Sequence, residues 1–513
     1  MNTILRPPVG RLNRLGWLAG ISLGLAACNL APTHQRPPLA VPAHIAPANA
    51  PAQAEGAAPS APANVPALAL DEWVQDERLR HVLRQALAHN RSLQQAVLNV
   101  ERARAVYGIT QANQLPTVGL SGQAARTRSA EDLGSAGRSV TQNQFSVQLG
   151  ITAFELDFWG RVRNLSEAAL QQYLAQTETQ HSVRLTLVGD VVQAWLNLAA
   201  DQQRLRLAQD TLAAREKAYE LTERMHALGA ASGLTLAQSQ STVDTARLDV
   251  AAYAAQVAKD RHALELLAGG PVSSPWLPGE NETQEAPETQ ETPQDTLAQP
   301  LAAIGAAPAA LPSDVLLRRP DIRAAEHQLQ AMNANIGAAR ANFFPRISLT
   351  AAVGLGSRAL SALFDSGNRT WNFAPGLTLP LFDGGANRAS LRVAEVDQQL
   401  AVNAYDRAVQ TAFREVADAL AEQQTWAQRL RSAHALVQAS QKALTLSQAR
   451  FKAGSDDYLS VLDAQRSLYA AQQQLISLRL AEQLSRAALY KALGGDAPAA
   501  PSAPAAPATP AAP

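Results

Sequence analysis

The stretch FSVQLGITAFEL, residues 145–156, alternates apolar side chains with small or polar ones. In a strand with this period, one face carries five apolar side chains: Phe145, Val147, Leu149, Ile151 and Ala153. The opposite face carries Ser146, Gln148, Gly150 and Thr152. This pattern is typical of a membrane strand that turns its apolar side chains toward lipid. An ordinary half-buried sheet gives the same pattern, so the stretch alone leaves both interpretations open.

Three further stretches alternate in a similar way, the first of them more weakly. They are TVGLSGQAART (117–127), ISLTAAVGLGS (347–357) and NFAPGLTLPLF (372–382). We predict strands over about 117–127, 143–156, 346–357 and 371–383. Four strands are too few to close a membrane barrel, for which about eight is the usual minimum. Several chains must therefore share one barrel, and three chains of four strands would supply twelve.

Two long segments are predicted to be helical, because residues 164–228 contain no proline and one glycine, and residues 389–453 contain neither. At 1.5 Å per residue, such a helix spans about 100 Å, which favours a coiled-coil-like assembly. Apolar residues recur at steps of three and four in both segments. They are Leu185, Val188, Val192, Trp195 and Ala199 in the first, and Val409, Phe413, Val416 and Leu420 in the second.

The chain contains an internal duplication. Residues 90–120 align with residues 319–349 at a shift of 229, which places Ala112 on Ala341, Asn113 on Asn342 and Pro116 on Pro345. The copies also end alike, in LELLAGG and LYKALGG. We therefore predict two repeats, over 76–270 and 314–495, each built as helix, two strands, long helix and shorter helix.

Proline- and alanine-rich or acidic segments surround the two repeats. Residues 28–75 are predicted to be a tether whose first part lies on a surface. Residues 271–313 contain ENETQEAPETQETPQDT and are predicted to be an acidic insert or linker. Residues 496–513 are predicted to be a disordered Ala/Pro tail.

Composition excludes several classes of protein. The chain has 44 basic and 44 acidic residues, so there is no basic excess to suggest nucleic-acid binding. A single cysteine rules out a disulfide framework or a cysteine-based metal site. The nine histidines are scattered without metal-ligand spacing, no serine or lone carboxylate has a nucleophilic context, and no GxxxxGK[ST] motif is present. We expect no cofactor, no metal and no enzymatic activity.

The single cysteine follows a signal-like segment. Arg6, Arg11 and Arg14 precede the apolar run 15–27, which is too short to span a membrane. The motif LAAC, ending at Cys28, resembles the lipobox of bacterial lipoproteins. The resemblance implies that residues 1–27 are removed and that Cys28 is acylated, and Asn29 after it implies the outer membrane. The alternative is a plain secretory signal with an incidental cysteine.

Several longer motifs, in order along the chain, are similar to those of one family. They are LPSDVLLRRPDI (311–322), RANFFPRISLTAAVGLGS (340–357), LPLFDGGANR (379–388) and YLSVLDAQRSLYAAQQQL (458–475). They resemble the outer-membrane factors of bacterial efflux pumps, the TolC/OprM superfamily, and best its OprM-like lipoprotein branch. The resemblance covers about residues 28–495.

This resemblance implies a mixed α and β membrane protein that assembles as a homotrimer. Its four strands per chain would form a 12-stranded outer-membrane β-barrel, continued by a long periplasmic α-helical barrel. It also implies docking onto a periplasmic adaptor protein and an inner-membrane transporter of the proton-driven RND type. The implied function is a passive exit duct for small toxic compounds.

The resemblance also assigns a candidate periplasmic gate. Leu459, Asp463 and Arg466 share one face of a helix. In a trimer, Asp463 would form a ring of three carboxylates that favours cations, and Leu459 would narrow the passage. Arg466 would hold Asp463 or a neighbouring helix. The alternative is a solvated aspartate with a local salt bridge.

Glycines mark the two hairpin tips. Gly229, Gly233 and Gly454 permit tight turns and are candidates for adaptor contact, or for turn geometry alone. The motif LFDGG (381–385) lies at a strand end before a helix, which favours chain reversal over a phosphate loop.

Two other functions stay open at the level of sequence. The same fold could serve as an exit duct for secreted polypeptides. A non-porous, structural coiled-coil lipoprotein is the alternative from another class, and the four alternating strands argue against it.

Overall fold

The computed structural model describes residues 29–45, 69–133, 138–279 and 311–495. The predicted signal peptide, Cys28, most of the acidic insert and the Ala/Pro tail lie outside these residues. The chain divides into two compact units, each drawn from both repeats. The first unit takes its residues from 1–37, 99–176 and 324–405, and the second from 38–98, 177–323 and 406–513.

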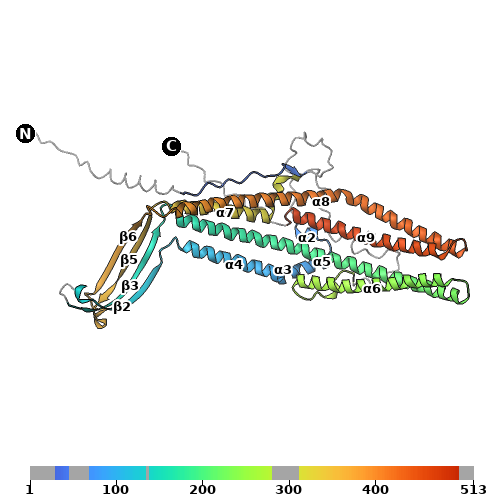
Figure 1. Ribbon diagram of the computed structural model, residues 1–513, viewed down its shortest axis with the longest axis horizontal. Helices are drawn as coiled ribbons and strands as arrows, with labels where there is room; N and C mark the ends of the chain where they lie inside the picture. The colour runs from blue at the N-terminus through green and yellow to red at the C-terminus, as the bar shows by residue number, and fades with distance from the viewer. Residues whose placement is uncertain (1–28, 46–68, 134–137, 280–310, 496–513) are drawn as a thin grey trace, which may run out of the picture. The chain divides into compact units, whose positions relative to one another are not determined.

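The first unit contains parts of four helices and a four-stranded antiparallel sheet (Figure 1). Its order is β2-β3-β5-β6, so each repeat contributes one hairpin and the hairpins meet at β3 and β5. The strands are β2 (Val118–Arg128), β3 (Thr141–Leu156), β5 (Arg346–Ser357) and β6 (Arg369–Thr378). The last strand ends five residues before its predicted limit at 383, because Pro380 has no N–H group and a glycine-containing turn follows.

Cross-strand register sorts the side chains of this sheet onto two faces. One row runs through Leu120, Leu149, Val353 and Trp371, which are directly opposite one another and 74%, 49%, 60% and 81% exposed. The neighbouring row, on the other face, runs through Ser121, Gln148, Gly354 and Thr370. The sheet therefore has one apolar face that the described residues leave exposed and one face of small and polar side chains.

A β-bulge interrupts β3, and it corrects the predicted face of one residue. The register shifts between Ile151 and Phe154, where Ala153 has a φ of 50° and its N–H donates to Thr350 Oγ1 at 3.1 Å. Ala153 therefore does not continue the apolar face with Ile151, as strict alternation predicts. Phe154 pairs with Leu349 instead, so the strand returns to its apolar face one residue later.

Within the first unit, residues after Cys28 lie against α7 (Pro320–Ala341). Arg36 donates two hydrogen bonds to the carboxylate of Glu326, at 2.8 and 2.9 Å. Arg340 donates to the carbonyl oxygen of Leu30 at 3.1 Å. A Cβ atom added at Gly337 would lie 2.8 Å from Ala31, so the two backbones approach closely. The start of the predicted tether is thus fixed on α7 by specific contacts.

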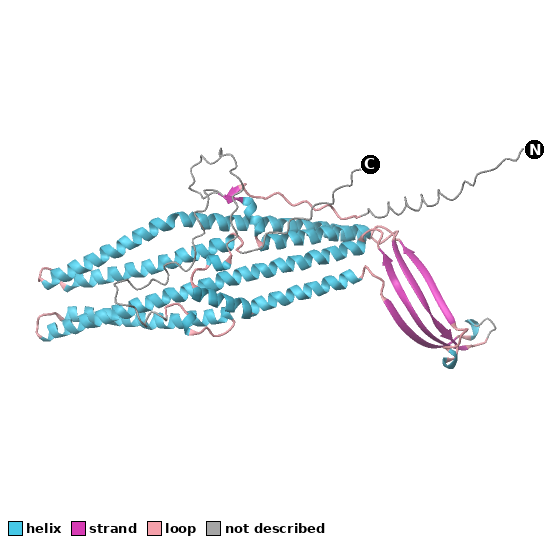
Figure 2. Cartoon of the chain, turned by 180° about the vertical axis from the view of Figure 1, so that it is seen from behind, coloured by secondary structure: helices cyan, strands magenta, loops and turns pink. Residues whose placement is uncertain are grey.

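The remaining architecture is helical (Figure 2). The chain forms α2 (Leu70–Trp73), α3 (Glu77–His89), α4 (Arg91–Ala112), α5 (Arg161–Ala227), α6 (Gly233–Ala268), α8 (Ala386–Lys452) and α9 (Tyr458–Ala492). Both α5 and α8 have 67 residues, about 100 Å at 1.5 Å per residue. Along the described part of the chain, no helix carries an apolar stretch long enough to cross a membrane.

Most residues of the two predicted apolar seams lie in the core of the second unit, while Leu185 and Phe413 are half-buried. Val188, Val192, Trp195 and Ala199 of α5 are buried, as are Val409, Val416 and Leu420 of α8. The same unit contains two aromatic stacks. Trp73 stacks on Tyr490 with ring centroids 3.9 Å apart, and His81 stacks on Trp276 at 4.0 Å. The short strands β1 (His44–Ile45) and β4 (Leu311–Pro312) pair with each other, and Ile45 is fully buried.

Candidate functional site

The three predicted gate residues lie on one side of α9, near its start. Arg466 donates to the Asp463 carboxylate at 2.7 Å, and both side chains are mostly exposed. Leu459 is 42% exposed, one residue after the helix begins at Tyr458. Asp457 caps the helix by accepting from the Ser460 N–H at 3.2 Å. In a single chain this is the geometry of a surface salt bridge, and the role of these residues as a gate stays a prediction.

Two of the three tip glycines have backbone conformations that favour glycine. Gly229 follows α5 with a φ of 74°, and Gly454 follows α8 with a φ of 71°. Each allows the N–H of the next residue to donate to a carbonyl oxygen in the last turn of the preceding helix. Ala230 donates to Met225, and Ser455 donates to Arg450. Gly233, the first residue of α6, lies outside this left-handed region. Turn geometry therefore explains Gly229 and Gly454, and adaptor contact at the tips stays a prediction.

The tip after α8 has an ion pair that sequence reasoning missed. Arg450 donates two hydrogen bonds to Asp456, at 2.6 and 2.8 Å, and this pairing lowers the pKa of the Asp456 carboxyl. The Phe451 and Tyr458 rings pack beside it, with centroids 5.2 Å apart. The six-residue separation spans a turn, so no helical spacing could have revealed the pair.

Polar contacts join the repeats along α5, α6 and α9 of the second unit. The Tyr469 hydroxyl donates to Asp249 at 3.1 Å, and Arg204 donates to Asp201 at 2.6 Å and to Ser477 at 2.9 Å. Burial, and then the neighbouring Asp201 carboxyl, raise the pKa of Asp260 to about 6. Much of this helix contact is therefore hydrogen-bonded rather than purely apolar.

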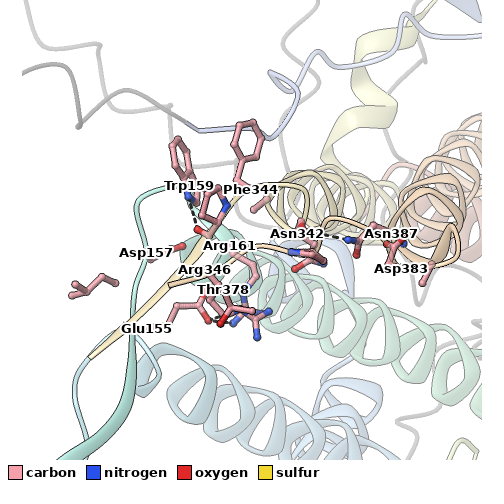
Figure 3. Close-up of a pocket in the computed structure, with 15 residues that line it drawn as sticks. Glu155, Asp157, Trp159, Arg161, Asn342, Phe344, Arg346, Thr378, Asp383 and Asn387 are labelled. Atoms are coloured by element: carbon pink, nitrogen blue, oxygen red, sulfur yellow. Dashed lines mark hydrogen bonds and ion pairs between the residues drawn. The ribbon is translucent and has the colours of Figure 1, made fainter. Parts of the chain in front are cut away.

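In the first unit, a charged cluster lies where β3 and β5 meet the helices (Figure 3). Arg161, at the start of α5, donates two hydrogen bonds to Glu155 of β3, at 2.8 and 2.6 Å. Arg346 of β5 lies 3.5 Å from the same carboxylate. Register places Glu155, Arg346 and Thr378 on the polar face of the sheet. One carboxylate thus ties two strands to a helix beside a cavity of about 380 Å³.

The other contacts of this junction are aromatic and backbone-mediated. Trp159 donates from Nε1 to the Pro345 carbonyl at 2.9 Å and stacks on Phe344 at 4.8 Å (Figure 3). Asp383 accepts from the N–H groups of Gly385 and Asn387, both at 2.8 Å, which lowers the pKa of its carboxyl. The chain's own carboxylate occupies these N–H groups, so LFDGG reverses the chain and does not bind phosphate.

None of the described residues form a group of three or more histidine, cysteine or acidic side chains able to hold a metal ion. The junction cavity collects arginine, carboxylate, amide and aromatic groups without a nucleophile paired to a base. Its geometry is that of a structural joint between sheet and helices.

Comparison with known proteins identifies the family. The family model described as outer membrane efflux protein matches residues 82–270 and 311–495. The toluene efflux pump outer membrane protein TtgF of Pseudomonas putida is 42% identical, over 93% of this chain and 95% of that protein. The outer membrane protein OprJ of Pseudomonas aeruginosa is 40% identical, over 93% and 94%.

A solved structure agrees with these sequence matches. The open state of the Neisseria gonorrhoeae MtrE outer membrane channel has a TM-score of 0.77 and 36% identity, over 91% of this chain and 98% of that chain. The predicted fold class is confirmed: the chain has the duplicated, mixed α and β fold of trimeric outer-membrane channels, with four strands in the larger sheet of the described residues. The predicted outer-membrane location, extending into the periplasm, and the role as an efflux channel are also confirmed. The chain belongs to the outer membrane efflux protein family.

Proposed function

We propose that this chain forms the passive outer-membrane exit duct of a tripartite pump that exports small toxic, lipophilic compounds. The toluene pump protein TtgF, at 42% identity, supports this class of substrate. A periplasmic adaptor protein and a proton-driven inner-membrane transporter of the RND type would complete the pump. Energy would come from that transporter, and the chain itself would catalyse no reaction.

The observation that carries this proposal is the two-faced sheet. Its row of exposed apolar side chains has no cover from the part of the chain that the structure describes; the row is Leu120, Leu149, Val353 and Trp371. Lipid provides that cover in a membrane strand, while the small and polar row on the other face lines a water-filled interior. A structural coiled-coil lipoprotein without a pore would have no use for such a sheet.

The edges of the sheet support a homotrimer. The sheet order leaves β2 and β6 with one neighbour each, so each has an unpaired row of backbone groups. Unpaired backbone groups are costly in lipid, and an open edge therefore needs another strand. Joining β6 of one chain to β2 of the next closes a barrel of twelve strands when three chains take part, four from each.

The lipid anchor and the gate belong to the same proposal. Cys28 would carry the acyl chains, directly before the segment fixed on α7. Leu459, Asp463 and Arg466 would line the periplasmic mouth, and the tips around Gly229, Gly233 and Gly454 would meet the adaptor. The ion pair between Arg450 and Asp456 would stabilise the turn after α8, where Gly454 lies.

Loss of the chain should cause small lipophilic molecules to accumulate in cells. In a host that keeps its adaptor and transporter but lacks other outer-membrane efflux channels, deletion should raise Nile red accumulation several-fold, and the wild-type gene should restore it. Gly354→Val should fail to restore it, because the new Cβ would lie 2.2 Å from the Val147 carbonyl oxygen in the sheet.

Gly367→Ala is the matched control, because a Cβ atom there meets nothing within 4 Å, and it should restore efflux fully. Unchanged dye accumulation in the deletion strain, together with loss of a secreted polypeptide, would contradict the proposal and support polypeptide export instead.

A further inference from the structure

A cavity of about 260 Å³ lies between α5, α6 and α9 in the second unit, with both polar and apolar side chains in its lining. Its lining comes from both repeats, and it includes two residues of the candidate gate, Leu459 and Arg466. The other polar lining residues are Arg215, Gln238, Ser241, Thr242 and Thr245. The cavity is several times larger than the roughly 30 Å³ that a water molecule takes in the liquid.

Arg215 is the unusual member of this lining, because it is 5% exposed and incompletely paired. Its Nη1 donates to the Thr242 carbonyl oxygen at 2.9 Å, and its guanidinium lies over the Tyr469 ring, 5.6 Å from the centroid. Its Nε is buried and has no hydrogen-bond partner among the residues that the structure describes. A buried cation without a full set of partners is costly, so the site favours a group that can accept from it.

The nearby carboxylates do not fill this role. Asp249 accepts from the Tyr469 hydroxyl, and Asp463 accepts from Arg466. Neither forms an ion pair with Arg215 within the described ranges. Burial lowers the pKa of Arg215, and the positive charge of Arg466 lowers it further, against the opposing influence of Tyr469 and Asp249. Among the described residues, no acceptor therefore reaches the buried Nε of Arg215.

The remaining lining groups suit an acceptor of hydrogen bonds. The Gln238 amide and the Ser241 hydroxyl can donate into the cavity. The Thr242 and Thr245 hydroxyls donate to backbone carbonyls of their own helix, each at 2.8 Å. A guanidinium offers five N–H donors in a planar fork that matches the oxygens of carboxylate or phosphate groups.

We propose that this cavity binds one small oxyanion, a phosphate, sulfate or carboxylate group, between Arg215 and Arg466. The bound group would accept from Arg215 Nε and from free N–H groups of Arg466, and so join α5 of the first repeat to α9 of the second. Binding does not depend on the gate. If Leu459, Asp463 and Arg466 do form the gate, an anion held beside them would also stabilise its closed arrangement.

The direct test measures binding of radiolabelled inorganic phosphate to the purified, full-length protein in detergent by equilibrium dialysis. The wild-type protein should bind about one phosphate per chain in a saturable way. Arg215→Met keeps the apolar length of the side chain without its charge, and should weaken binding about tenfold or more. Arg247→Met is the matched control: Arg247 is an exposed arginine of α6 that pairs with Glu216 and Asp244 outside the cavity, and its loss should leave binding unchanged.

Ser241→Ala is a second cavity variant, which tests the proposal even if the Arg215 variant fails to fold. Ser241 is exposed, so its replacement should fold normally and should still weaken phosphate binding several-fold. Absence of saturable binding to the wild-type protein, or equal binding by the wild-type and both cavity variants, would overturn the proposal. Saturable phosphate binding that only Arg247→Met reduces would also overturn it.

Competition separates the two sources of oxyanion. N-acetylglutamate amide mimics an acidic side chain of a polypeptide. Displacement of phosphate by this compound at comparable concentration supports a site that an acidic side chain can fill. Displacement by sulfate alone supports a site for a free tetrahedral anion. Retention of bound phosphate against both competitors would contradict a cavity that is open to exchange.

Discussion

Replacement of Cys28 by serine is expected to abolish labelling of the protein by a palmitate analogue, while the wild-type protein labels strongly. The expected effect is all-or-none because the sequence has one cysteine and therefore one thiol to which an acyl group can be attached. Several acyl chains at one residue give durable anchoring, which a single chain does not. The measurement is gel fluorescence after growth with an alkyne-tagged palmitate.

Export should survive in part in this variant. The apolar face of the sheet is an independent membrane signal, and the hydrogen bonds from Arg36 to Glu326 fix the adjacent segment without lipid. Asn29→Gln, beside the cysteine, is a suitable control and should label like the wild type. The lipoprotein interpretation is wrong if the wild-type protein itself takes up no label.

The combined change of Asp463→Ala and Arg466→Ala is expected to raise single-channel conductance in a planar bilayer and to weaken cation preference. Three Asp463 carboxylates near one axis would repel one another and attract cations, so their removal abolishes the ring. The double change also removes the ion pair within α9, in which Arg466 donates to Asp463 at 2.7 Å. The fold should persist, because an exposed salt bridge contributes about 0–1 kcal/mol to stability.

Ser460→Ala is the control for this gate, since Ser460 lies one residue away from the shared face and should change conductance much less. Ion-selectivity measurements under a salt gradient separate loss of the ring from simple widening. A double variant that conducts like the wild type, with the same ion preference, would assign Asp463 and Arg466 to ordinary helix surface.

Local periodicity explains which parts of the fold were predictable from the sequence. Alternation at period two requires only neighbouring residues, and the four alternating stretches coincide with the four strands of the larger sheet. Apolar residues at steps of three and four likewise located the buried seams of α5 and α8, where Val188, Val192 and Val416 are buried. These patterns are repeated along many residues, so a single irregular position does not hide them.

The features that sequence reasoning missed depend on partners far away in the chain. The bulge at Ala153 is fixed by the Thr350 hydroxyl on another strand, so strict alternation misplaced this residue. Glu155 joins Arg161 and Arg346 only because β5 lies beside β3. In the sequence, nothing distinguishes Arg215 from the other charged residues of α5. Its burial results from the packing of α6 and α9. Pairing across elements leaves no periodic signal in a single sequence.

The mass of the purified protein in mild detergent tests the central claim most directly. That claim is that one chain supplies only four strands of a closed barrel, because the sheet order ends at β2 and β6 with an open edge on each side. Light scattering coupled to size-exclusion chromatography, corrected for bound detergent, measures the protein mass of the assembly. The account predicts the mass of three chains, stable on dilution. A stable, folded protein with the mass of one chain would contradict it.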